Sequence, residues 1–177
     1  MKAQRILMVV LVLILGLGSL SAPVNAQADV MEANKATFTR IIDEAWNAGN
    51  LDAVNEIVAP DFVAHTPNGD IETADGLRNL VIGNLRGAMS DLHMEIDLLI
   101  AEADWVGSRV TMTGTFDGVF LTSQGPIQSN GQPVVLTFNN IDRFENGQFV
   151  EEWTAFDTLA FLTQLGAIPM PEGAPGD

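Results

Sequence analysis

The chain has 177 residues, with 23 acidic and 8 basic side chains and a formal net charge of −15 at pH 7. Such an acidic protein repels nucleic acid and anionic lipid, so neither is expected as a partner. The absence of cysteine excludes disulfides, thiolate chemistry and a lipid-modified N-terminal cysteine.

The first 28 residues have the features of a signal peptide. Lys2 and Arg5 precede an apolar run, residues 6–20, and Ala26-Gln27-Ala28 follows as a cleavage site. The run is shorter than the roughly 20 apolar residues that comfortably span a bilayer, and an uncleaved anchor is the alternative. We therefore expect an exported protein, periplasmic or secreted, with no stable membrane association after cleavage.

Helical periodicity dominates the first part of the remaining chain. One amphipathic helix, which Gly49 ends, carries Phe38, Ile41, Ile42, Ala45 and Trp46 on its apolar face. A short second helix, with Asn50 as its N-cap, carries Leu51, Val54 and Ile57. After the extended piece DFVAHTPNG, Thr73 is the candidate N-cap of a third helix, whose apolar face is Leu77, Leu80, Val81, Leu85 and Ala88.

From residue 92 the apolar period changes to two, which predicts strands. The predicted strands are residues 92–100, 106–116, 134–144 and a fourth that begins at Val150, and residues 121–133 form a loop. Helices followed by long antiparallel strands indicate an α+β fold. We expect a curved antiparallel sheet of about four to five strands wrapped around the N-terminal helices, with an internal pocket. This domain is residues 29–168, followed by a disordered tail, residues 169–177.

Asp157 lies where the fourth strand changes to a helix. Read with period two, it shares one face with Phe149, Glu151, Trp153 and Ala155. Leu159, Phe161, Leu162 and Leu165 then recur at helical spacing up to Gly166. Two interpretations remain open: Asp157 is a helix N-cap, or it is a buried acid at the floor of the pocket.

Three segments together resemble one known family. NGQFVEEWTAFDTLAFLTQLGAI, DFVAHTP and GTFDG are similar in order and spacing to motifs of the SnoaL-like polyketide cyclases, also called ester cyclases. These proteins have the cone-shaped nuclear transport factor 2-like fold. The resemblance covers roughly Lys35 to Ile168, and Gln148 replaces the usual lysine.

The resemblance implies an intramolecular aldol ring closure without metal or cofactor. It matches the catalytic aspartate, a general acid/base, to Asp157, and it makes His65 a candidate second proton carrier. Burial beside Trp153 would raise the pKa of the Asp157 carboxyl toward neutrality, which suits proton transfer. The signal peptide is a departure, because known aromatic polyketide pathways are cytoplasmic; the polyketide substrate is thus not implied.

The remaining candidate residues concern binding. Trp153 is a candidate pocket wall, Phe138, Asn139 and Asn140 are candidate substrate contacts, and either amide could polarise a carbonyl. Glu151 is expected to pair with Arg109 or Arg143. Two histidines without cysteine predict no metal site. We expect a small apolar molecule as ligand, with a non-catalytic exported binding module as the alternative function. The exposed sheet face is a candidate homodimer surface.

Overall fold

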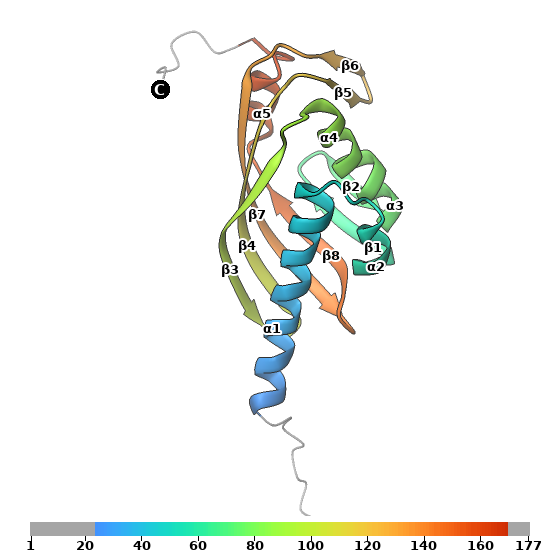
Figure 1. The fold of residues 1–177 in the computed structure, drawn as a ribbon, viewed down its shortest axis with the longest axis vertical. Coiled ribbons are helices and arrows are strands. Elements are labelled where there is room, and N and C mark those ends of the chain that lie inside the picture. The colour runs from blue at the N-terminus through green and yellow to red at the C-terminus, as the bar shows by residue number, and fades with distance from the viewer. Residues whose placement is uncertain (1–23, 170–177) are drawn as a thin grey trace, which may run out of the picture.

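The computed structural model describes residues 24–169, which form a curved sheet covered on one face by helices (Figure 1). The predicted signal peptide lies outside the described residues except for Val24 to Ala28, which belong to the first helix. The predicted tail lies outside them except for Pro169. The helices are α1 (Val24–Arg40), the π-helix η1 (Ile41–Asn47), α2 (Ala53–Ile57), α3 (Ala74–Gly76), the π-helix η2 (Leu77–Gly83), α4 (Asn84–Ala88) and α5 (Thr158–Gln164).

The main sheet has six strands in the order β2-β1-β8-β7-β4-β3. Only β1 and β8 run parallel; the other neighbours are antiparallel. A separate hairpin, β5–β6, lies at the α5 end of the molecule (Figure 1). The strands are β1 (Val58–Thr66), β2 (Gly69–Glu72), β3 (His93–Glu102), β4 (Trp105–Thr115), β5 (Val119–Thr122), β6 (Gly125–Gln128), β7 (Pro133–Glu145) and β8 (Gln148–Ala155).

The predicted α+β fold with a curved sheet is confirmed, but the predicted number of strands is too small. The extra strands form two hairpins, β1–β2 and β5–β6, where only an extended piece and a loop were expected. Both hairpins turn through a Thr-x-x-Gly sequence, in which the hydroxyl of Thr66 or Thr122 donates to the carbonyl of the glycine three residues later at 2.7 Å. The glycines have φ of +109° and +119°, which other residues rarely adopt. These turn sequences are local signals for the two hairpins, and the expectation of four to five strands did not include them.

The helices follow the predicted faces with two corrections. The predicted apolar face of the first helix is buried except for Trp46, which is partly buried. In the third helical segment Leu80 is exposed and Ile82 is buried instead, because η2 has the wider π-helical turn and this shifts the periodicity. Thr73 caps α3 as predicted, accepting from the amide of Gly76 at 3.2 Å. Asn50 is not a cap, because α2 starts after Asp52.

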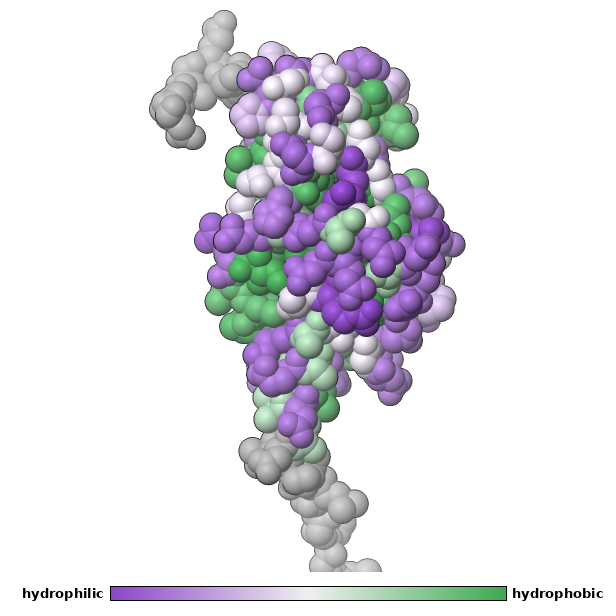
Figure 2. Space-filling model, in the orientation of Figure 1, coloured by the Kyte–Doolittle hydropathy of each residue, from purple (hydrophilic) through white to green (hydrophobic). Residues whose placement is uncertain are grey.

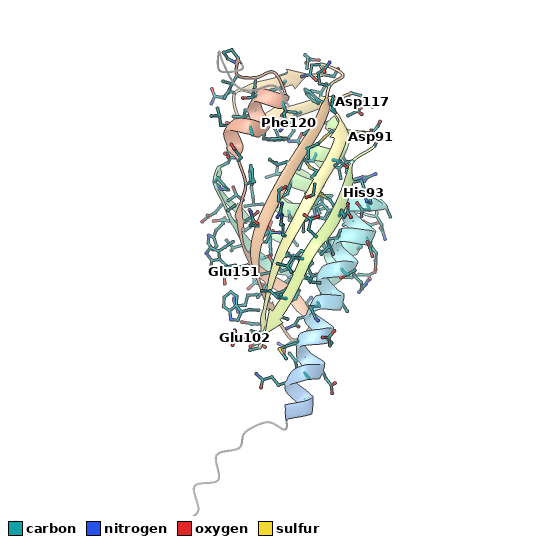
Figure 3. All side chains as sticks on the ribbon, turned by 90° about the vertical axis from the view of Figure 1, so that its left-hand side faces the viewer. Asp91, His93, Glu102, Asp117, Phe120 and Glu151 are labelled. Carbon is teal, nitrogen blue, oxygen red and sulfur yellow. The ribbon has the colours of Figure 1, made fainter. Side chains whose placement is uncertain are left out.

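A bulge in β8 decides which side chains face the helices. Arg143 pairs with Glu151 but Phe144 pairs with Phe149, so β8 has one extra residue, Val150, at this point. The alternation predicted from Phe149 onward is therefore interrupted. Phe149 and Glu152 both face inward, while Glu151 faces outward (Figure 3).

None of the helices within residues 24–169 combines the length and the apolar character needed to cross a membrane.

Candidate functional site

A cavity of about 1250 Å³ lies between the helices and the inner face of the sheet. It is larger than the roughly 300–1,000 Å³ of a typical ligand pocket. Its walls come from α1, η1, η2 and α4 on one side and β1, β7 and β8 on the other, and α5 with the β5–β6 hairpin contributes the end. Most lining side chains are apolar, and seven are aromatic: Phe38, Trp46, Phe120, Phe138, Phe149, Phe156 and Phe161.

The β5–β6 hairpin is attached to the rest of the cavity wall at two places. Phe120 packs edge-on against Phe161 of α5, with ring centroids 5.5 Å apart (Figure 3). On the other side the Asn84 side-chain nitrogen donates to the carbonyl oxygen of Leu121, and the Asn84 side-chain oxygen accepts from the amide of Leu121, each at 2.9 Å. One aromatic contact and one side-chain amide therefore help to hold the hairpin at the end of the cavity.

A row of polar groups crosses the inner face of the sheet. The Asn140 amide nitrogen donates to the Ser108 hydroxyl at 3.0 Å, and the Thr154 hydroxyl donates to the Asn140 carbonyl oxygen at 2.7 Å. Asn140 and Thr154 line the cavity. Asn140 is therefore the inward-facing member of the predicted Asn139–Asn140 pair, and Asn139 is exposed. Phe138 lines the cavity as expected and packs against Phe156.

Two carboxyl groups lie beside this polar row. Glu152 on β8 is directly opposite Asp142 on β7, so both side chains are on the inner face. Glu152 is the only ionisable residue among the described residues that line the cavity. Burial raises the pKa of Glu152 to about 7. Asp142 is fully buried behind it, and burial together with repulsion from Glu152 raises the pKa of Asp142 well above its usual value.

Neither acid was predicted as a site residue, although the sequence of β7 carries a signal for one of them. Asp142 is in phase with the apolar row Val134, Leu136, Phe138 and Phe144, all of which face inward. An acid in such a row is rarely buried without a function or a partner. The sequence contains no comparable sign that Glu152 faces inward, because the bulge at Val150 changes the face of β8 on which Glu152 lies relative to Phe149.

The structure places Asp157 outside the cavity and corrects the expectation that it is buried. The residue is exposed, and its carboxylate accepts a hydrogen bond from the amide of Ala160 at 2.9 Å. The interpretation as a helix N-cap is therefore confirmed. The predicted stop at Gly166 is also in place, with φ of +74°.

His65 and Trp153 also lie away from the cavity, on the outer face of the sheet. They are directly opposite each other on β1 and β8, with ring centroids 4.9 Å apart, and Trp153 is 39% exposed. The His65 Nδ1 is 3.1 Å from Asp70 and its Nε2 is 3.2 Å from Glu151. These hydrogen bonds raise the pKa of His65. Glu151 also accepts from Arg143 Nε at 2.9 Å, one of its two predicted partners.

The outer face of the sheet also carries exposed apolar side chains, which are Leu98, Ile100, Trp105, Val135, Ile141 and Trp153. Figure 2 shows apolar surface along the edge of the molecule where β3 lies. The expected homodimer through this face stays a prediction. Among residues 24–169, no group of three or more His, Asp or Glu side chains is arranged to hold a metal ion.

Comparison with known proteins assigns the family. The chain matches the SnoaL-like polyketide cyclases over residues 36–165. The protein belongs to this family. No match is found among curated proteins.

Solved structures agree with the assignment. A candidate SnoaL-like polyketide cyclase from Jannaschia sp. CCS1 is 26% identical, with a TM-score of 0.69 over 79% of this chain and 96% of its own. AclR, a candidate hydroxylase from Streptomyces galilaeus, is 29% identical, with a TM-score of 0.67 over 80% and 87%. IdmH, a candidate polyketide cyclase from Streptomyces antibioticus, is 25% identical, with a TM-score of 0.62 over 75% and 98%. Because these names cover more than one chemistry, the activity must be argued from the site.

Proposed function

We propose that this SnoaL-like protein is a cofactor-independent acid/base enzyme that acts next to a carbonyl group of a small, mostly apolar molecule. Aldol ring closure or a related carbonyl reaction fits this description. The observation that carries the proposal is Glu152, which is the one ionisable group that residues 24–169 place on the wall of an apolar cavity and whose pKa burial raises to about 7. A proton carrier works best when its pKa is close to the operating pH.

The chemistry needs one group that both takes and returns a proton. The Glu152 carboxylate would remove a proton from the carbon next to a carbonyl, and the enolate carbon would then attack a second carbonyl of the same molecule. The protonated Glu152 would return the proton to the alkoxide that this attack forms. Asn140 uses one amide hydrogen on Ser108, and its other hydrogen is a candidate donor to a substrate oxygen.

Asp142 has a supporting role in this proposal. Burial and repulsion from Glu152 raise the pKa of Asp142 as well, so two negative charges at this pair are disfavoured. The pair therefore holds a proton more firmly than a single exposed carboxyl would, and Glu152 is the member of the pair that lines the cavity. Asp157, the residue that the family resemblance matches to the catalytic aspartate, is not needed in this scheme. We further propose that the enzyme is exported, which rests on the N-terminal sequence alone.

Deuterium exchange tests the first step without knowledge of the natural substrate. An apolar ketone such as α-tetralone is incubated with the protein in D₂O near pH 7.5, and mass spectrometry follows exchange next to the carbonyl. We expect Glu152→Gln to lose most of the catalysed exchange. Glu151→Gln is the matched control, because it removes the same charge one residue away on the opposite face.

Asp157→Asn separates the two candidate acids. Asparagine caps a helix about as well as aspartate, so the fold should stay intact. If Glu152 carries the proton, this variant keeps the exchange rate of the wild type. Loss of exchange in Asp157→Asn with full exchange in Glu152→Gln would overturn the assignment. Equal, uncatalysed exchange in all variants would favour the non-catalytic binding module.

A further inference from the structure

The two acids on the inner face of the sheet, Glu152 and Asp142, differ from Glu151 on the outer face in having no cationic partner among the described residues. Glu151 is bonded to Arg143 and to His65, whereas none of the ion pairs among the described residues includes Glu152 or Asp142. The described residues that line the cavity include no lysine, arginine or histidine. The cavity therefore has a negative group and no positive one.

Asp142 also lacks hydrogen-bond partners. Both of its carboxyl oxygens are buried, and neither bonds another group of the described chain. A buried polar group without a partner costs free energy, and the cost is larger for a group that can be charged. A cation next to Glu152 would reduce the free-energy cost of burying the Glu152 charge. Its positive charge would also act on the nearby Asp142 carboxyl through the electric field.

The walls around the acids suit an organic cation better than a hydrated ion. Ala64 on β1 lies directly opposite Glu152, and Asp142 is its titratable neighbour on β7. From α1 and η1 the cavity is lined by Phe38, Ile41, Ile42 and Trp46, none of which can ionise. Aromatic faces attract a desolvated cation, and seven aromatic side chains line this cavity. The strongly negative net charge of the protein also favours the approach of cations.

We propose that the cavity takes a hydrophobic amine, an apolar molecule with one protonated amino group that pairs with Glu152 while the apolar part lies against the aromatic walls. This inference names a class of ligand that the cavity binds, and it rests on the proposed function only for the identity of the site. Molecules of the same size that end in a carboxylate are excluded, because they would bring a second negative charge to the acid pair.

A set of three ligands with the same alkyl chain tests the proposal. Dodecylammonium, dodecanol and dodecanoate compete with the neutral fluorescent probe Nile red, below their micelle concentrations, at pH 8 and about 0.3 M salt to screen the protein surface. We expect dodecylammonium to bind at least about tenfold more tightly than dodecanol, and dodecanoate at least about tenfold more weakly. In Glu152→Gln, dodecylammonium should fall to the level of dodecanol, whose own affinity stays the same.

Glu151→Gln is again the control, since it changes the net charge equally and should keep the order of the three ligands. Because Glu152 must be ionised, dodecylammonium should also bind more weakly at pH 6 than at pH 8, while dodecanol should not change. Dodecanoate binding as tightly as dodecylammonium in the wild type would overturn the proposal, whether or not any variant folds. A preference for dodecylammonium that persists in Glu152→Gln would also overturn it.

The exchange assay distinguishes this inference from the proposed function, because it uses a neutral ketone. Loss of exchange in Glu152→Gln without any preference for dodecylammonium would leave the proposed function standing and refute this inference alone.

Discussion

Glu151 and Glu152 show how strongly the face of a strand decides the chemistry of a residue. They are neighbours of the same type, but their pKa values move in opposite directions. Burial alone would raise the pKa of Glu151, but hydrogen bonds from Arg143 and His65 outweigh it and lower that pKa. Glu152 has burial without a partner, so its pKa rises.

The raised pKa of Glu152 predicts how stability depends on pH. An unfolded glutamate releases its proton near pH 4.5, whereas the folded protein holds the Glu152 proton up to about pH 7. The folded state therefore binds more protons in this window, and the contribution of Glu152 to stability falls as pH rises from about 4.5 to 7 and is constant above that. Glutamine cannot ionise, so the stability of Glu152→Gln should not show this decrease with rising pH.

Denaturant unfolding of both proteins between pH 4.5 and 8 measures the difference. We expect Glu152→Gln to equal the wild type near pH 4.5 and to be more stable by about 2 kcal/mol at pH 8, because residual water in the cavity reduces the full penalty. Carboxyl groups far from Glu152 cancel in this comparison, whereas Asp142 does not, because the charge of Glu152 raises its pKa. A difference that does not change with pH would show that Glu152 is not desolvated.

At the scale of elements, the GTFDG segment explains how β4 meets α4. The Asp117 carboxylate at its end accepts from the amide of Ser90 at 3.0 Å, and Asp91 accepts from the amide of Thr115 at 2.6 Å (Figure 3). The amide of Gly118 donates to Ala88 at 2.9 Å. The end of β4 is thereby held against the end of α4, which positions β5 over the cavity.

Gly118 is the residue at this contact that tolerates no side chain. A Cβ there would lie 2.0 Å from the carbonyl oxygen of Gly87, which is backbone and cannot rotate away. We expect Gly118→Ala to cost about 2 kcal/mol or more of unfolding free energy and to weaken Nile red binding, because the hairpin must move. Gly87→Ala is the control: a Cβ at Gly87 meets nothing within 4 Å, so thermal unfolding should be nearly unchanged. Equal stability of the two variants would contradict this account.

At the scale of the whole molecule, the buried part of α1 begins after the predicted cleavage site. Residues 26–30 are exposed, and Asn34 is the first buried residue of the helix. The predicted cleavage after Ala28 would thus fall before the first buried residue of the helix, and residues 26–28, which it removes, are exposed. The end of the predicted signal peptide and the start of the packed core are separate positions on one helix.

Export and truncation can be tested together. The intact mass of protein from the extracytoplasmic fraction should correspond to a chain that begins near Gln27 or Asp29. A chain that begins at Asp29 should also unfold within about 1 kcal/mol of one that begins at Val24, since exposed positions contribute little. A full-length mass would indicate an anchor, and a large loss of stability would mean that the first turns contact the core.

The sequence by itself determined the class of fold, most elements and the family. Amphipathic spacing in α1 and η1, the two-residue period of β3, β4 and β7, and the cap at Asp157 are local properties, so neighbouring residues suffice to predict them. The two Thr-x-x-Gly hairpins also depend on neighbouring residues. The expectation of an extended piece and a loop did not take their turn chemistry into account.

Only the tertiary structure decided which acid faces the cavity. Alternation along a strand separates two faces but does not say which one the helices cover, and a bulge of one residue exchanges the faces beyond it. The bulge at Val150 arises from the pairing of β8 with β7, a contact between segments whose register no local pattern specifies. It turns Trp153 and Glu151 outward and Glu152 inward, opposite Asp142, and the chemistry of the cavity follows from that one change of register.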